Sequence, residues 1–309
     1  MRTLSVALLA VAVVACQKAP SLLDSTVAQK TTDSPTAERA DRADAPTHKP
    51  GASAPRLSGL GGSADDRLAR IEKRLDKVVE ILDGALPPSE PDPMATYSVP
   101  VDAIDPVEGP ADAKITIVEG FEFLCPYCFM VNPTVEQILQ KYPKDVRVVA
   151  KYLVIHGQPA LPPGMMACAA AKQGKYSAMK AALWSHLFKL ENGNPAVQRD
   201  QIDPTALRQV ATDVGLDMTR LDGDMKDCQK WLTSSEQELR PLGANGTPAF
   251  FINGRFLNGA QPLEKFDAVI KEELAKADKA IADGTSQADF YNKVVVAKGE
   301  KKVRGHFDD

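Results

Sequence analysis

The segment 67–86 has apolar residues at a helical spacing. They recur at intervals of three and four positions, with charged residues between them, and they are Leu68, Ile71, Leu75, Val78 and Leu82. This apolar stripe is typical of a coiled-coil helix. Leu followed by Ile at its first two positions favours three or four strands over two, so we expect self-association with a trimer favoured. Because the stripe covers under three heptads, packing of the helix on the chain's own folded domain is the alternative.

One folded domain is expected over 112–309, where segments with the apolar pattern of strands alternate with segments of helical periodicity. Segments 114–119 and 146–154 are rich in β-branched residues and predict two strands. A helix is predicted from the Cys125-Pro126 step to about Lys141, because proline is well placed in a first helical turn. Strand, helix and strand in this order indicate an α/β fold.

In the rest of this domain the sequence predicts a helical insertion, a hairpin and a last helix. The insertion is expected at about 163–242, where Ala-rich helical periods include a run at 165–190 and a helix that opens at Asp203-Pro204. Two short apolar segments then flank Asn253-Gly254, a strong signal for a two-residue β-hairpin. An amphipathic helix is expected at about 263–282.

The first fifteen residues have the pattern of an export signal. Arg2 precedes an apolar run that is too short to span a bilayer, and Cys16 follows it. The tetrapeptide 13–16, Val-Val-Ala-Cys, resembles the lipobox of bacterial lipoproteins, in which the signal is cut before a cysteine that receives lipid. We therefore expect an exported protein, anchored by lipid at Cys16 on the periplasmic face of a bacterial membrane. An ordinary secretory signal is the alternative.

Two segments are predicted to connect rather than to fold. Residues 16–66 are rich in Ala, Ser, Thr, Asp and Pro and contain no aromatic residue, so they are expected to be a disordered tether. Four prolines follow the helix 67–86, and the segment 87–111 is expected to be a stiff spacer before the folded domain.

The charge balance excludes one class of partner. The chain has 37 Lys and Arg residues against 41 Asp and Glu residues, a formal net charge of -4, and no basic block that would follow a phosphate backbone. We therefore expect no nucleic-acid partner.

The tetrad Cys-Pro-Tyr-Cys at 125–128 lies where a predicted strand gives way to a helix. Cys125 falls at the helix N-terminus, where unpaired N–H groups and the helix dipole stabilise a thiolate, so it is the predicted nucleophile. Cys128, one turn further, is expected to resolve the mixed disulfide. Zinc binding and a purely structural disulfide are the alternatives; zinc would need a second pair of ligands, and a bridge over so short a loop restricts the unfolded chain little. We expect no metal and no cofactor.

Three motifs resemble the DsbA-like branch of the thioredoxin-fold proteins. They are FEFLCPYC at 121–128, ACAAAKQGKY at 167–176 and GTPAFFING at 246–254, and the resemblance extends over about 112–282. It implies a thioredoxin fold with an inserted α-helical domain, acting on the thiols or disulfides of exported proteins. A membrane redox partner is implied as well.

The resemblance also assigns roles to further residues. Thr247 and Pro248 match the dipeptide with a cis peptide bond that lies against the cysteine pair and offers backbone groups to an extended substrate. Glu119 matches a buried acid that helps to move a proton at the resolving thiol. A solvated or ion-paired strand carboxylate is the alternative for Glu119.

The direction of electron transfer is predicted from one residue that departs from the pattern of the family. Tyr127 stands where the best-known oxidase of the family has His, and a neutral phenol supplies no positive charge to a thiolate. Together with Thr247, it looks more like the isomerase and reductase relatives of the DsbG and ScsC types. We therefore expect a disulfide isomerase or reductase, with a dithiol oxidase as the alternative. A tethered peptide-binding or holdase module without redox turnover is the alternative from another class.

Cys168 and Cys228 both fall in the helical insertion. If lipidated Cys16 is set aside, four cysteines remain, enough for two pairs. A disulfide between Cys168 and Cys228 is expected to close a loop of about 60 residues and to contribute about 4 kcal/mol. Two buried free thiols are the alternative. His156 is expected to be a packing or turn residue rather than a base.

Overall fold

The computed structural model describes residues 62–86 and 90–306. The predicted export signal, the lipidation site Cys16 and nearly all of the predicted tether lie outside the described residues. Within the described ranges, no helix combines the length and the apolar character needed to cross a membrane.

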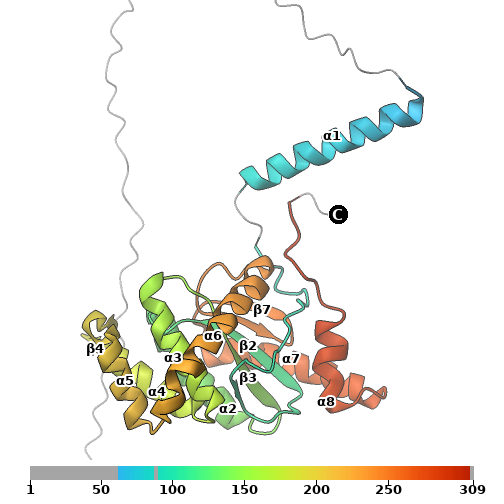
Figure 1. Cartoon of the computed structure of the whole chain (residues 1–309). Coiled ribbons are helices and arrows are strands. Elements are labelled where there is room, and N and C mark those ends of the chain that lie inside the picture. The colour runs from blue at the N-terminus through green and yellow to red at the C-terminus, as the bar shows by residue number, and fades with distance from the viewer. Residues whose placement is uncertain (1–61, 87–89, 307–309) are drawn as a thin grey trace, which may run out of the picture. The chain divides into compact units, whose positions relative to one another are not determined.

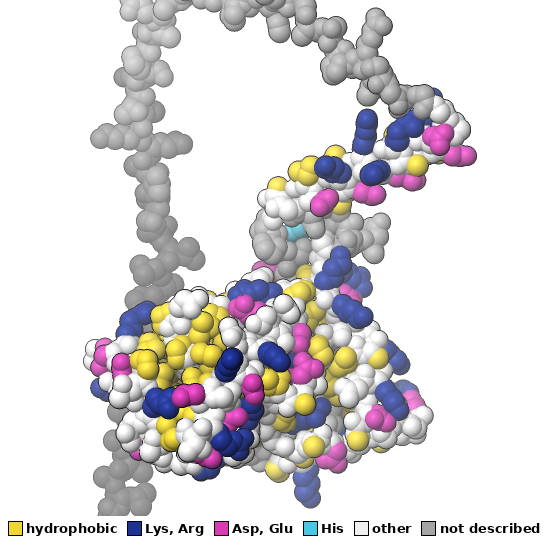
Figure 2. Space-filling model, in the orientation of Figure 1, with side chains coloured by type: hydrophobic (Ala, Val, Ile, Leu, Met, Phe, Trp, Pro, Cys, Tyr) yellow, Lys and Arg dark blue, Asp and Glu magenta, His cyan; other side chains and the backbone are white. Residues whose placement is uncertain are grey.

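The first described helix is α1, Ala64–Ala85, which includes most of the predicted coiled-coil segment. It begins three residues before the predicted start because Ser63 caps it: the Ser63 hydroxyl accepts from the backbone N–H of Asp66, and the Asp66 carboxylate accepts from the N–H of Ser63. The apolar stripe is exposed, with Leu68 and Leu75 at 57% and 58%, and Figure 2 shows hydrophobic side chains on the surface of this helix. Self-association of α1 stays a prediction.

The folded domain is built on a five-stranded sheet in the order β1-β3-β2-β6-β7. Figure 1 labels its strands β2, β3 and β7. Strand β2 is central and buried along its whole length, and it runs parallel to β3 and antiparallel to β6. The remaining neighbours, β1 with β3 and β6 with β7, are antiparallel. The strands are β1 Val107–Glu108, β2 Ile115–Phe121, β3 Val146–Tyr152, β6 Ala249–Ile252 and β7 Arg255–Asn258.

Helices cover both faces of this sheet. On one face α2, Pro126–Lys141, and α7, Leu263–Ala282, bury apolar side chains against β2, β3 and β6. On the other face lie α8, Gln287–Phe290, and the π-helical segment η4, Tyr291–Val296, whose buried side chains share a core with Val118 of β2. Helices α2 and α7 and the hairpin β6–β7 have the positions that the sequence predicted.

The insertion between β3 and β6 holds four α-helices, three short 3₁₀ helices and a small hairpin. Helices α3 and α6 pack side by side and are joined by a disulfide between Cys168 and Cys228. The elements are η1 Gln158–Ala160, α3 Leu161–Lys172, α4 Tyr176–Leu187, β4 Phe188–Glu191, β5 Asn194–Val197, η2 Arg199–Ile202, α5 Pro204–Asp213, α6 Met218–Leu239 and η3 Arg240–Leu242.

Two sequence predictions differ from the structure. The helical run predicted at 165–190 is broken at Gly174, whose backbone is left-handed (φ +70°), and its end at Phe188 belongs to the β4–β5 hairpin. The folded domain also extends into the segment 87–111 that was predicted as a spacer, and its strand β1 lies there. Tyr97 is only 1% exposed, and its backbone N–H donates to the carbonyl of Gly254 over 2.8 Å, so the folded domain begins well before residue 112.

Candidate active site

The two cysteines lie where the central strand β2 leads into helix α2. Cys125 is the N-cap residue of α2 and Pro126 follows in the first turn, where a missing N–H costs nothing. The backbone N–H of Cys128 donates to the Sγ of Cys125 over 3.4 Å. Both side chains are buried, Cys125 with 2% and Cys128 with 0% exposure. The helix therefore holds the two sulfur atoms one turn apart, with Cys125 at its open end.

The two thiols have opposite proton affinities. The pKa of Cys125 is lowered to about 6, chiefly by a hydrogen bond from the Cys128 thiol, and backbone N–H groups of α2 add to this against the effect of burial. The pKa of Cys128 is raised well above its usual value, first by burial and then by the Cys125 sulfur and the Glu119 carboxylate. At neutral pH Cys125 is thus mainly the thiolate and Cys128 the thiol.

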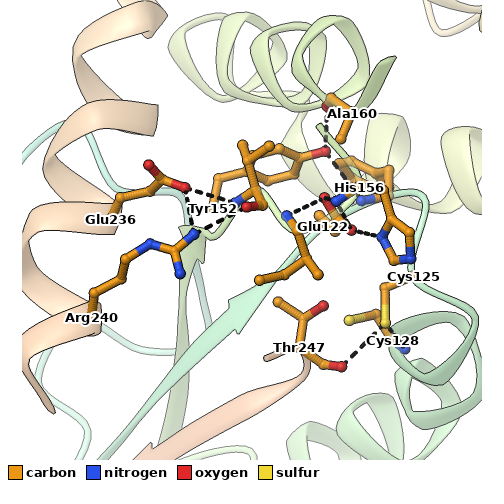
Figure 3. Close-up of polar contacts among 12 residues, drawn as sticks. Glu122, Cys125, Cys128, Tyr152, His156, Ala160, Glu236, Arg240 and Thr247 are labelled. Atoms are coloured by element: carbon orange, nitrogen blue, oxygen red, sulfur yellow. Dashed lines mark hydrogen bonds and ion pairs between the residues drawn. The ribbon is translucent and has the colours of Figure 1, made fainter. Parts of the chain in front are cut away.

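The loop before β6 closes the site from the other side. The peptide bond between Thr247 and Pro248 is cis, as the family resemblance implied. The Sγ of Cys125 lies 3.2 Å from the carbonyl oxygen of Thr247, to which the thiol form donates (Figure 3). This loop leads directly into β6, whose first residue Ala249 pairs with Gly120 of β2. Strand pairing therefore fixes the loop against the cysteine pair.

Glu119 lies on β2, six residues before Cys125, with 7% of its surface exposed. Burial raises its pKa to about 7, and the positive charge of Lys180 in α4 opposes that effect. Lys180 is itself buried, and its ammonium group is paired with the carboxylate of Glu108 in β1. Glu119 is therefore neither solvated nor directly paired, and its carboxyl group is half ionised near neutral pH.

Sequence reasoning did not single out two charged residues of this region. Lys180 lies in the insertion, and Glu122 lies in the turn between β2 and α2 with no exposed surface. A carboxylate between the aromatic residues Phe121 and Phe123 was the one local signal for Glu122. Within the described part of the chain, no group of three His, Cys, Asp or Glu side chains is arranged to hold a metal ion.

A family model described as DSBA-like thioredoxin domain matches residues 116–271, just over half of the chain. Among solved structures, a thioredoxin-like oxidoreductase from Silicibacter pomeroyi DSS-3 is 28% identical; the match covers 58% of this chain and 94% of that one, with a TM-score of 0.47. The catalytic domain of Proteus mirabilis ScsC is 26% identical, covers 56% of this chain and 91% of its own, and has a TM-score of 0.47.

The curated relatives are much longer than the region they share with this chain. The Na(+)/H(+) antiporter NhaA 3 of Salinispora tropica is 31% identical over 186 residues, which are 58% of this chain and 26% of the antiporter. The chain therefore spans about a quarter of the length of the curated relatives that it matches.

Proposed function

The chain belongs to the DSBA-like thioredoxin domain family of thiol-disulfide oxidoreductases, and we propose that it exchanges disulfides with exported proteins through Cys125 and Cys128, mainly as a disulfide isomerase or reductase. The observation that carries this proposal is the asymmetry of the pair. Cys125, with its pKa lowered to about 6, is the nucleophile, and Cys128, with its pKa raised, is a thiol held one helical turn away.

The reaction runs through a mixed disulfide. The Cys125 thiolate attacks a substrate disulfide, forms a bond to one sulfur and releases the other as a thiolate. Cys128 then attacks Cys125, which releases the substrate thiol and leaves a disulfide between the two cysteines. For this second step the Cys128 thiol must lose its proton. Glu119, buried nearby with a pKa of about 7, is in the right protonation range to accept it.

The loop at Thr247 is proposed to hold the substrate. Its carbonyl oxygen lies at the sulfur of Cys125, so an extended peptide that pairs with the backbone of Thr247 would bring its own cysteine to that sulfur.

The direction of electron flow follows from how strongly the thiolate is stabilised. A lower pKa of the nucleophile stabilises the reduced enzyme and makes it more oxidising, and the pKa is about 7 in thioredoxin and about 3.5 in the strong oxidant DsbA. A value of about 6 for Cys125 is nearer to the first. Tyr127, which is 62% exposed, adds no charge beside it. If the redox potential of the cysteine pair, measured against glutathione, is about -120 mV, the enzyme is instead an oxidase.

The exchange reaction itself is tested by trapping. In the Cys128→Ser variant the mixed disulfide cannot be resolved, so substrate proteins should accumulate on Cys125 as adducts that dithiothreitol removes. A second replacement, Cys125→Ser, should abolish the adducts. A peptide-binding module without redox turnover would form no covalent adduct in either variant.

Location and assembly are part of the proposal. Lipid at Cys16 would anchor the enzyme on the periplasmic side, where a membrane protein would restore the oxidation state of the cysteine pair. The exposed apolar stripe of α1 favours association of several chains through this helix, with a trimer favoured. Light scattering on the chain with and without residues 64–85 tests the association, and the same number of chains per particle in both proteins would refute it.

A further inference from the structure

Glu122 is a buried carboxylate whose partners all come from one loop. The backbone N–H groups of Ile155 and His156 donate to it over 3.0 Å and 3.2 Å, and the imidazole Nδ1 of His156 forms an ion pair with it. Since a buried carboxylate is costly without such partners, its position fixes that of the loop 153–157. The side chain of Glu122 therefore joins the active-site turn to the loop that follows β3.

The same loop is held from a second direction. The backbone N–H of Val154 donates to the carboxylate of Glu236 over 3.3 Å, and the guanidinium of Arg240 donates to the carbonyl of Val154 over 3.1 Å. In Figure 3 this network runs from Glu236 and Arg240 at one end to His156 at the other, where Cys125 also lies. The backbone that carries His156 is thus fixed on both sides.

This arrangement orients the imidazole of His156. Its Nδ1 is occupied by Glu122, and the backbone carbonyl of Glu122 accepts from the N–H of Cys125 over 3.3 Å, so the ring is attached to the turn that carries Cys125. The side chain of His156 is 38% exposed. The second ring nitrogen, Nε2, is therefore left for a group that approaches from solvent. A carboxylate that fixes one ring nitrogen and leaves the other for proton transfer is a common arrangement in enzymes.

The proposed reaction needs a proton carrier on the solvent side. A substrate sulfur that leaves as a thiolate takes up a proton, because an ordinary cysteine has a pKa of about 8.5. Glu119 is buried and is proposed to serve Cys128, so the substrate sulfur needs a different proton donor. In Figure 3 His156 and Cys125 are drawn at the same end of the network, and of the two His156 is the more exposed to solvent.

Resting on the proposed function, we infer that His156 is the general acid and base for the substrate thiol and that Glu122 is its positioning residue. When the Cys125 thiolate attacks a substrate disulfide, the sulfur–sulfur bond of the substrate breaks, its electron pair stays on the leaving sulfur, and the protonated His156 donates a proton to that sulfur. In the reverse step His156 accepts the proton of a substrate thiol, and the sulfur of that thiol attacks the substrate sulfur that is bonded to Cys125. The bond between that sulfur and Cys125 breaks, and its electron pair returns to Cys125 as the thiolate.

A comparison of leaving groups tests this role. The His156→Gln variant and the unaltered enzyme are each reduced and mixed with two disulfides: a peptide disulfide with ordinary cysteines, and Ellman's reagent, whose aromatic thiolate leaves without a proton. Loss of a general acid should slow the peptide disulfide by at least about tenfold and leave the rate with Ellman's reagent nearly unchanged. Both rates are compared at an equal folded fraction of the two proteins, because the free thiols of an unfolded chain also react much faster with Ellman's reagent than with a peptide disulfide.

The control is His186→Gln, because His186 lies in α4 and contacts the carbonyl oxygen of Gln201. It should leave both rates unchanged, while Glu122→Gln should show the selective loss in weaker form. Equal slowing with both disulfides, or no slowing with either, would overturn the role of His156. An unaltered enzyme that reduces neither disulfide would instead refute the proposed function.

Discussion

Replacing Cys128 with Ala should raise the pKa of Cys125, because the Cys128 thiol is the largest cause of its lowering. The replacement removes this donor and leaves the backbone N–H of residue 128 in place. It therefore separates the contribution of the second thiol from that of the helix N-terminus. Cys128→Ser is the matched control, since its hydroxyl group can donate to the thiolate in the same way.

The size of the effect follows from the strength of one charge-assisted hydrogen bond. Such a bond contributes about 1.5 to 3 kcal/mol, and one pKa unit corresponds to about 1.36 kcal/mol. Its loss should raise the pKa of Cys125 from about 6 by roughly one to two units. At pH 6 the thiolate fraction would fall from about one half to between about a tenth and a hundredth.

The pKa is best read from the thiolate absorbance at 240 nm as pH is varied. Alkylation rates are a second measure, although the intrinsic reactivity of a thiolate rises with its pKa and partly hides the change. The Ser variant should titrate close to the unaltered enzyme, and the Ala variant at clearly higher pH. If the Ala variant also titrates near pH 6, the backbone of α2 alone holds the thiolate and the assigned cause is wrong.

Three further predictions concern the buried acid and the insertion. In the folded protein Glu119 binds its proton up to a pH of about 7, whereas in the unfolded chain it loses it at about 4.3, so stability is lost as pH rises between these values. Glu119→Gln should therefore raise the free energy of unfolding by about 3 kcal/mol at pH 8 and change it little at pH 4; urea unfolding showing the same change at both pH values would contradict this. Lys180→Met should raise the pKa of Glu119 further and move the pH profile of mixed-disulfide resolution upward, while Lys172→Met, on the surface of α3, should not move it. Replacing both Cys168 and Cys228 with Ala, which opens a bridge over a sequence separation of 60, should cost about 4 kcal/mol in unfolding free energy; a loss below about 1 kcal/mol in urea would refute the chain-entropy account.

Elements with strong local signals were predicted well from the sequence. The helix Pro126–Lys141 has a proline in its first turn, and the hairpin at Asn253-Gly254 has the favoured two-residue turn, so local chemistry alone determines where they begin. The hairpin β4–β5 was missed for the opposite reason. Phe188 continues the apolar period of α4, but its ring stacks on that of Phe129 in α2 at a centroid distance of 4.6 Å. That contact is not visible in the local sequence.

The candidate site likewise contains residues that the local sequence predicts and residues that it does not. Cys125 and Cys128 could be predicted because two residues at one short spacing carry the chemistry. The ion pair of Glu122 with His156 joins residues 34 positions apart, and that of Lys180 with Glu108 joins residues 72 positions apart. Such pairs depend on how strands and inserted helices are placed in space, and one sequence without homologues gives no measure of that.

The protonation of the inner residues bears on which reaction the enzyme favours. An isomerase must both form and resolve mixed disulfides at the same pH, so the group that serves Cys128 must give a proton as readily as it takes one. A carboxyl group with a pKa of about 7 meets this condition near neutral pH, and burial alone would push Glu119 further toward the protonated form. The charge of Lys180 opposes that push, and Glu108 limits how far it does so. If Glu119 serves Cys128 as proposed, the inserted helix α4 supplies the charge that keeps this buried acid usable in both directions.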